Sequence, residues 1–313
     1  MRLVFLGNDL WSVPSLEALA AHPGLDVAAV ITNPPRPAGR GSRLTPTAVA
    51  DAARALGIEV LEVDGVRQGT GFDAIRVAAP DALVVVAYGE LLSPEVLTLP
   101  RLGAVNVHFS LLPRWRGASP VQHAILAGDL RTGVTLMQMD AGLDTGPILA
   151  SATQDVLPTD DAGSLGVRLS TIGAELLSNT LPAYGSGEVK PRPQPDQGVT
   201  HAPKLGSADR VVAWDQAAQA VVARVRALAP DPGARTNFRG EALKLLRVKV
   251  STSASSSATA EPGTVVDVDE QGPLIAAGSG LIRLIMVAAS GRKRMSGADW
   301  ARGARIQPGE RLG

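Results

Sequence analysis

Three side chains of this sequence have the types needed for proton transfer: Asn106, His108 and Asp144. Asn106 and His108 lie in the apolar run "GAVNVH", and both point to the same face because side chains alternate along a strand. Asp144 lies in the glycine-flanked segment "DAGLDTGPI". The three residues offer an amide donor, a titrating imidazole and a carboxylate that orients it, which suits acid–base catalysis. The spacing does not establish whether Asp144 reaches the histidine.

Other chemistries fit these residues less well. A metal site would need more histidine or carboxylate ligands at regular spacing, and the nearby carboxylates are Asp140 and Asp144. A serine hydrolase would need a Gly-x-Ser-x-Gly turn, which the segment "HFSLLP" around Ser110 does not provide. A purely structural role for a histidine on a strand stays open.

The elements around these residues predict an open, mostly parallel sheet. Apolar runs of strand length occur at residues 2–7, 26–32, 81–89 and 103–108. Segments between them have the apolar spacing of helices. Such continuous apolar strands are typical of sheets with helices on both faces, and ligands bind there outside the carboxyl ends of the strands. We therefore expect Asn106 and His108 to face a crevice of a Rossmann-like sheet. No G-x-G-x-x-G follows the first strand, which disfavours a nicotinamide or flavin cofactor.

One helix has both of its ends marked in the sequence. In "TPTAVADAARALG", Thr45 is the expected N-cap and Pro46 the first helical residue. Gly57 follows directly after the last residue of the pattern, as expected just past a helix end.

The second half of the chain predicts a different architecture. Two strands around a glycine-rich loop (133–156) and a long helix (160–181) precede a segment rich in proline and glycine. A further helix and several short strands then follow, at residues 214–228, 242–250, 263–269, 273–278 and 281–287. Short strands at such spacing favour a small, OB-like β-barrel. The expected domains are residues 1–184 and 206–313, with a linker at 185–205.

Composition limits the classes of protein to which this chain can belong. It has 313 residues, of which 45% are hydrophobic and 19% charged, as in a globular protein of two domains. Without cysteine, it has no disulfide framework, thiolate nucleophile or cysteine-ligated metal. The first apolar run is too short for a signal peptide, and no stretch approaches about 20 apolar residues. We therefore expect a cytoplasmic protein with no membrane span.

Charge is divided unevenly along the chain. Residues 1–205 carry 15 Lys+Arg and 20 Asp+Glu, a net charge of −5. Residues 206–313 carry 15 Lys+Arg and 10 Asp+Glu, a net charge of +5. This asymmetry predicts a basic C-terminal module that binds a polyanion.

Longer stretches of the sequence resemble a known family. "NVHFSLLPRWRGASPVQHAILAGD" followed by "TGVTLMQMDAGLDTGPIL" is similar to the methionyl-tRNA formyltransferases. The likeness extends to "NPPRPAGRGSRLTPTAV", which resembles that family's arginine-bearing insertion loop, and to the C-terminal "GRKRMSGADWARGARIQPGERL". The resemblance implies formyl transfer from 10-formyltetrahydrofolate to the α-amino group of methionine on the initiator tRNA, in translation initiation. It implies no metal, and it suggests a monomer.

The resemblance also implies roles for individual residues. Asn106 and the imidazolium of His108 would donate hydrogen bonds to the oxyanion on the formyl carbon, and Asp144 would hold His108 and accept or relay the amine proton. The folate would lie along the turn formed by Ser110, Leu111, Leu112 and Pro113. Its pterin would pair with backbone around Ala87, Tyr88, Gly89, Leu91, Met139 and Gly142.

Basic residues acquire an expected partner in the same way. Arg36, Arg40 and Arg43 of the insertion loop would contact the acceptor stem of the tRNA. Arg292, Lys293 and Arg294, with Arg302 and Arg305, would supply phosphate attraction that does not depend on sequence. Arg114 and Arg116 are expected to shape the crevice or to meet the acceptor end.

Two other functions and one departure remain open at this stage. A folate-dependent sugar or nucleotide formyltransferase would share the N-terminal half but not the basic insertion and C-terminal domain. An RNA-binding protein with a catalytically silent crevice would not require Asn106, His108 and Asp144. Phe109 occupies a position that is usually small in the family, so its ring must point away from the ligand or narrow the pocket.

Overall fold

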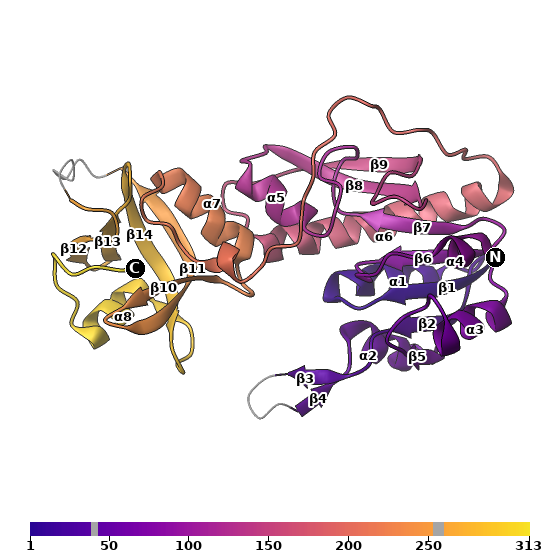
Figure 1. Ribbon diagram of the computed structural model, residues 1–313, viewed down its shortest axis with the longest axis horizontal. Helices are drawn as coiled ribbons and strands as arrows, with labels where there is room; N and C mark the ends of the chain where they lie inside the picture. Colours follow the sequence, from indigo (N-terminus) through magenta and orange to yellow (C-terminus); the bar gives the residue numbers. More distant parts are fainter. Residues whose placement is uncertain (39–42, 253–259) are drawn as a thin grey trace. The chain divides into compact units, whose positions relative to one another are not determined.

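The computed structural model of this protein describes residues 1–38, 43–252 and 260–313 (Figure 1). The chain forms two compact units. The first comprises Met1–Pro120, Arg131–Asp155 and Gly166–Pro203, and the second comprises Val121–Leu130, Val156–Leu165 and Lys204–Gly313. Arg40 of the insertion loop lies outside the described residues.

A seven-stranded sheet forms the centre of the first unit, in the order β5-β2-β1-β6-β7-β8-β9 (Figure 1). Its strands are β1 (Arg2–Gly7), β2 (Asp26–Thr32), β5 (Val60–Glu62), β6 (Ala82–Val86), β7 (Ala104–His108), β8 (Arg131–Gln138) and β9 (Ile148–Asp155). The five strands from β5 to β7 are parallel, whereas β8 and β9 are antiparallel to their neighbours. The predicted mostly parallel sheet is thus confirmed. The chain order reverses between β1 and β6, which is the topological switch point.

Both faces of this sheet are covered. Leu3, Val4, Phe5 and Leu6 of β1 are all 0% exposed, although alternate residues of a strand point to opposite faces. On one face, Val4 and Leu6 belong to a core cluster that includes Ile75 and Val96 from two of the helices. The helices of this part of the chain are α1 (Val13–Ala21), α2 (Ala48–Ala55), α3 (Gly69–Ala78), α4 (Pro94–Thr98), α5 (Pro120–Leu126) and α6 (Ala162–Ser186).

Helix α2 begins two residues later than the sequence predicts. Its N-cap is Thr47, whose side chain accepts a hydrogen bond from the Ala50 N–H, and not Thr45. Thr45 instead ends β4 (Arg43–Thr45), which pairs with β3 (Arg36–Ala38) as a small hairpin. Both threonines can cap a helix, and only the pairing of the hairpin decides between them. Gly57 follows the helix with φ +72°, as expected.

The ring of Phe109 points away from Asn106 and His108. It packs edge-to-face against Trp11, with ring centroids 6.0 Å apart, and lies beside Gly173 of α6. The alternation of the strand places Phe109 on the opposite face from His108. Its bulk is therefore accommodated by a glycine of α6 and does not narrow the site.

The second unit contains an antiparallel sheet, which was also predicted. The strands follow the order β10 (Ala234–Phe238), β11 (Glu241–Ser251), β14 (Leu281–Ala289), β13 (Gly272–Ala276) and β12 (Val265–Asp269), and β15 (Met295–Ser296) pairs with β14. Bridges from Leu312 to Phe238 and from Arg311 to Thr264 connect the C-terminal segment to both ends of this order. The segment thereby closes the sheet towards a barrel.

A hydrophobic core of its own fills the second unit. It joins strand residues to α7 (Ala218–Leu228) and α8 (Gly297–Ala304), and the rings of Phe238 and Trp300 meet edge-to-face at 5.2 Å. The sequence pattern did not indicate β10 or α8. Across the described ranges, no helix combines the length and apolarity that crossing a bilayer would require.

Gly166 of α6 offers a test of packing in the first unit. A Cβ at this position would lie 2.1 Å from the ring of Trp11, so we expect Gly166→Ala to lower the free energy of unfolding by about 1–3 kcal/mol. Gly303→Ala in α8 is the matched control, because nothing lies within 4 Å of its added Cβ. There the higher helix propensity of alanine should stabilise by up to about 1 kcal/mol. Denaturant unfolding measures both, and equal effects would contradict this packing.

Candidate active site

The structure brings Asn106, His108 and Asp144 together on one face of β7. The Asn106 Nδ2 donates a hydrogen bond to the Asp144 Oδ1 at 3.3 Å. The His108 Nδ1 lies 3.6 Å from the Asp144 Oδ2. The His108 side chain is 5% exposed and that of Asp144 12% exposed, so the carboxylate and the imidazole meet largely out of water.

Asp144 reaches this face from an unexpected direction. Because β8 is antiparallel to β7, the loop 139–147 leaves the sheet beside Ala104, where the Met139 N–H donates to the Ala104 carbonyl. The loop then folds back across the face of β7. Asp144 has φ +53°, and a Cβ at Gly146 would lie 1.9 Å from the Gln138 carbonyl oxygen. The tight return of this loop therefore requires the glycine of the "DTG" sequence.

The two ring nitrogens of His108 face two acceptors. The Nε2 lies 2.9 Å from the Trp115 carbonyl oxygen. Since a carbonyl can only accept, the Nε2 carries a hydrogen, and the Nδ1 then faces the Asp144 carboxylate.

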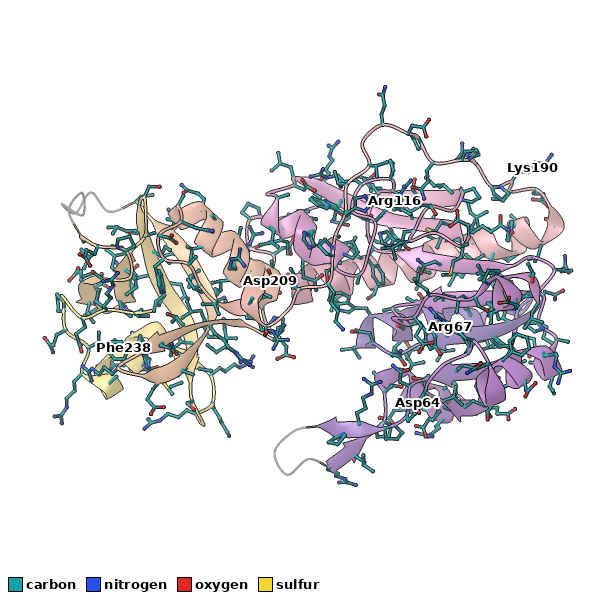
Figure 2. All side chains as sticks on the ribbon, in the orientation of Figure 1. Asp64, Arg67, Arg116, Lys190, Asp209 and Phe238 are labelled. Atoms are coloured by element: carbon teal, nitrogen blue, oxygen red, sulfur yellow. The ribbon has the colours of Figure 1, made fainter. Side chains whose placement is uncertain are left out.

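The backbone of residues 115–117 completes the site. The Gly117 N–H donates to the Asp144 Oδ2 at 2.8 Å, while Trp115 supplies the carbonyl for His108. Trp115 has φ +64°, a conformation that side chains other than glycine rarely adopt. Arg114 lies over its ring, 4.2 Å from the centroid. Arg116, labelled in Figure 2, donates two hydrogen bonds to the Gln194 Oε1 from its Nε and Nη2.

The predicted folate turn, residues 110–113, is largely internal. Ser110 is 0% exposed, and its hydroxyl donates to the Arg114 carbonyl at 2.6 Å. The Thr135 hydroxyl donates to the Ser110 carbonyl and accepts from the Leu112 N–H. Leu111 packs over Gly133, and a cis peptide bond joins Leu112 to Pro113. In this structure the Ser110 hydroxyl holds the Arg114 carbonyl, and the backbone of Ser110 and Leu112 is held by Thr135.

A cavity of about 630 Å³ adjoins the other predicted folate contacts. Asp64, Gly65, Arg67 and Gln68 line it from the segment after β5, and Gly89, Glu90 and Leu91 line it from the segment after β6 (Figure 2). Its size is in the range of small-molecule sites. Ala87 is exposed, with φ +44°, whereas Tyr88 is buried and belongs to the core. Burial, together with Glu90, raises the pKa of the Tyr88 hydroxyl, which therefore stays neutral.

Asn8 supports this segment, and the sequence analysis did not identify it. Its Nδ2 donates to the Tyr88 carbonyl, and its Oδ1 accepts from the Thr32 hydroxyl and from the Asn33 N–H. Asn8 thus joins the carboxyl ends of β1, β2 and β6 at the switch point. Its place directly after the first apolar strand was the signal that could have revealed it.

The other predicted contacts in the 139–147 loop are of two kinds. Met139 packs against the core, while Gly142 is exposed and its N–H donates to the Asp140 carboxylate. Asp140 also accepts from the Thr145 hydroxyl, so it closes a turn. Over the part of the chain that the structure describes, no cluster of three or more histidine, cysteine or acidic side chains could hold a metal ion.

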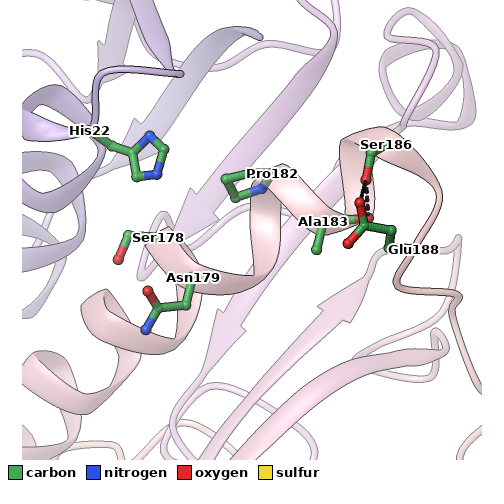
Figure 3. A pocket seen from close by; sticks show the side chains of 7 residues that line it. All are labelled: His22, Ser178, Asn179, Pro182, Ala183, Ser186 and Glu188. Carbon is green, nitrogen blue, oxygen red and sulfur yellow. Dashed lines mark hydrogen bonds between the residues drawn. The ribbon is translucent and has the colours of Figure 1, made fainter.

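A second cavity, of about 480 Å³, lies apart from these residues (Figure 3). His22 and residues of α6 and its C-terminal end line it, among them Asn179, Pro182 and Glu188. None of the predicted site residues contributes to it. It therefore has no part in the candidate active site.

Comparison with known proteins identifies the family. A family model described as formyl transferase matches residues 1–181, and one described as formyl transferase, C-terminal domain, matches residues 204–305. The methionyl-tRNA formyltransferase of Streptomyces coelicolor is 45% identical over 313 residues, covering 100% of both chains. This chain belongs to the methionyl-tRNA formyltransferase family.

Solved structures share the fold of this methionyl-tRNA formyltransferase family member at low identity. HypX from Aquifex aeolicus in complex with tetrahydrofolic acid has a TM-score of 0.65 and 19% identity, over 96% of this chain and 47% of the HypX chain. This chain thus spans about half the length of HypX. A methionyl-tRNA formyltransferase from Clostridium thermocellum has a TM-score of 0.57 and 14% identity, over 80% of this chain and 94% of that chain.

The predicted tRNA contacts of this formyltransferase lie on exposed elements. Arg36 and Arg43 are exposed, and the register of the β3–β4 hairpin pairs Arg36 with Thr45 and Ala38 with Arg43. Because paired residues share a face, Arg36 and Arg43 lie diagonally on one face of the hairpin. Arg292, Lys293 and Arg294 are exposed between β14 and β15. Arg302, by contrast, forms an ion pair with Asp299.

Gly117→Ala tests the backbone contact to Asp144. Gly117 has φ +122°, and an added Cβ would lie 2.7 Å from the Ala202 carbonyl oxygen, so the segment that donates to Asp144 must shift. We expect formyl transfer to fall about 100-fold, since misplacement of catalytic groups by about 1 Å has effects of this size.

Gly57→Ala is the matched control for this substitution. Gly57 also has positive φ, +72°, but nothing lies within 4 Å of its added Cβ. This variant should lose some stability and keep its activity. Equal activities of the two variants would show that the Gly117 contact is not needed.

Proposed function

We propose that this protein transfers the formyl group of 10-formyltetrahydrofolate to the α-amino group of methionyl initiator tRNA. The convergence of Asn106, His108 and Asp144 on one face of β7 carries the proposal. The family membership supports it, and so does the 45% identity to a methionyl-tRNA formyltransferase over the full length of both chains. A cytoplasmic, monomeric enzyme would be consistent with a substrate of translation.

Stabilisation of negative charge is the harder part of the proposed reaction. A free α-amino group titrates near about 8, so the nucleophile becomes neutral at little cost. When nitrogen attacks the formyl carbon, its carbonyl oxygen becomes an oxyanion, and a single positioned donor typically contributes about 3–4 kcal/mol there. The donors that we assign are the Asn106 amide and the His108 Nδ1–H.

The observed contacts leave these donors available. The Asn106 amide has two N–H groups, and the hydrogen bond to Asp144 uses one of them. The His108 Nδ1 is 3.6 Å from the Asp144 carboxylate, longer than a hydrogen bond, whereas the Nε2 is held by Trp115. The Asp144 carboxylate would accept the proton that the amine releases. As the tetrahedral intermediate collapses, the bond between the formyl carbon and the folate nitrogen breaks, and this nitrogen takes up a proton and leaves as tetrahydrofolate.

The folate-type donor has a suitable site beside these groups. The cavity of about 630 Å³ exposes Gly89 and Leu91 of the segment that follows β6. Val85 of β6 pairs directly with Asn106 of β7, so this segment begins next to the catalytic face. The solved HypX complex with tetrahydrofolic acid, which shares the fold, also supports a folate donor. We assign the pterin to the backbone of residues 87–91 and 139–142.

We assign tRNA binding to the basic residues of both units. Residues 206–313 carry a net charge of +5, and Arg36 and Arg43 share one face of the hairpin. In domain terms, residues 1–184 would form the catalytic domain, 185–205 the linker and 206–313 the tRNA-binding domain. The 45% identity to a methionyl-tRNA formyltransferase over the whole chain favours a tRNA acceptor over a sugar.

Substitution of each catalytic residue tests the mechanism. Asn106→Ala, His108→Ala and Asp144→Ala should each lower kcat/KM for charged initiator tRNA by about 100-fold or more. None should change the affinity for tRNA. The assay is formyl transfer from 10-formyltetrahydrofolate, with uncharged tRNA and free methionine as controls. Asn179→Ala, an exposed asparagine on α6, is the matched control; retained turnover in the His108 variant would refute the mechanism.

Arg36→Ala combined with Arg43→Ala tests the role of the hairpin. Loss of two phosphate contacts should weaken binding of initiator tRNA. The slope of the logarithm of the binding constant against the logarithm of the salt concentration should become shallower by about 2. The KM for the folate donor should not change. Arg76→Ala with Arg131→Ala removes the same charge from two exposed ion pairs elsewhere. An equal loss in this control pair would show that net charge matters and not contact by the hairpin.

A further inference from the structure

A strap of chain beyond α6, residues 192–202, is hydrogen-bonded across the loops of the active site. At its start, Arg192 and Ile148 exchange two backbone hydrogen bonds, of 2.7 and 2.8 Å. At its end, the Arg116 N–H donates to the Thr200 carbonyl and the Ala202 N–H donates to the Arg116 carbonyl, at 2.9 and 2.7 Å. The expected linker is therefore partly a fixed element of the first unit.

Gln194 is the one side chain of the strap that joins both active-site loops. Its Nε2 donates to the carbonyls of Asp144 and Gly146, each at 2.8 Å. Its Oε1 accepts from the Nε and the Nη2 of Arg116, at 3.1 and 2.7 Å. The amide of Gln194 thus links the loop that carries Asp144 to the segment 115–117 by hydrogen bonds; we call this link the bracket.

The backbone that this bracket holds is strained. Asp144 and Trp115 have φ +53° and +64°, and such conformations persist only where the surrounding structure enforces them. Gln194 holds the carbonyls on both sides of the Asp144–Gly146 return, and the Thr200 hydroxyl accepts from the Trp115 N–H at 2.9 Å. The strap therefore holds the residues that supply both partners of His108.

We infer that Gln194 is a positioning residue for formyl transfer, acting on Asp144 through its backbone. This inference rests on the proposed function. Gln194 touches neither Asn106 nor His108 in the described contacts, and its amide is committed to four protein hydrogen bonds, so it sets geometry without taking part in proton transfer.

Gln194→Ala and Gln194→Glu test this role. A glutamate can still accept from Arg116, but it cannot donate to the two carbonyls. Both variants should therefore lower kcat for charged initiator tRNA about 100-fold, with KM values for tRNA and folate near those of the wild type. Gln197→Ala is the matched control, because Gln197 is exposed in the same strap and makes none of these contacts. Full activity of Gln194→Glu would show that only Arg116 matters and would overturn the role assigned to the donors.

A double-mutant comparison separates positioning from loss of stability. If Gln194 acts through Asp144, then Asp144→Ala with Gln194→Ala should be no slower than Asp144→Ala alone, within about twofold. Losses that multiply in the double variant, or a Gln194→Ala enzyme as active as the wild type, would overturn the inference. An inactive wild-type protein would instead refute the proposed function, and thermal unfolding of each variant reports its stability separately.

Discussion

The negative charge of Asp144 is the constraint on which the site depends. Its side chain is only 12% exposed, and a carboxylate removed from water is costly unless polar groups surround it. Asn106, Gly117 and His108 supply such groups to its two oxygens. This carboxylate thus also organises the structure, because it brings groups from β7 and from residues 115–117 to one place.

The rest of the first unit serves to hold those partners still. The sheet fixes Asn106 and His108 through regular pairing of β7 with β6 and β8, whereas residues 115–117 and the 139–147 loop have no such ladder. They are held instead by side-chain hydrogen bonds. Ser110 donates to the Arg114 carbonyl, and Gln194 of the strap donates to the Asp144 carbonyl. Backbone ladders thus fix the strands, whereas side-chain hydrogen bonds fix these irregular loops.

Each of the two units has a hydrophobic core of its own. The second encloses Trp214, Phe238 and Trp300 among its strands and helices. The basic residues of the second unit then stay on its surface, where Arg292, Lys293 and Arg294 are exposed. These positive charges thus stay in contact with water and none of them has to be buried in the core.

The sequence by itself indicated many of the strands, the mostly parallel sheet, a second unit of short strands and the family, because hydrophobic periodicity and local motifs express them directly. It also placed Asn106 and His108 on one face, which period two requires. Only the tertiary structure decided that Asp144 meets them, that Phe109 faces α6, and that Thr47 caps α2. These outcomes depend on an antiparallel neighbour, on a glycine of a distant helix and on a hairpin pairing. Asn8 and Gln194 escaped prediction for the same reason: a single amide acquires its role only when segments far apart in the chain come within hydrogen-bond distance.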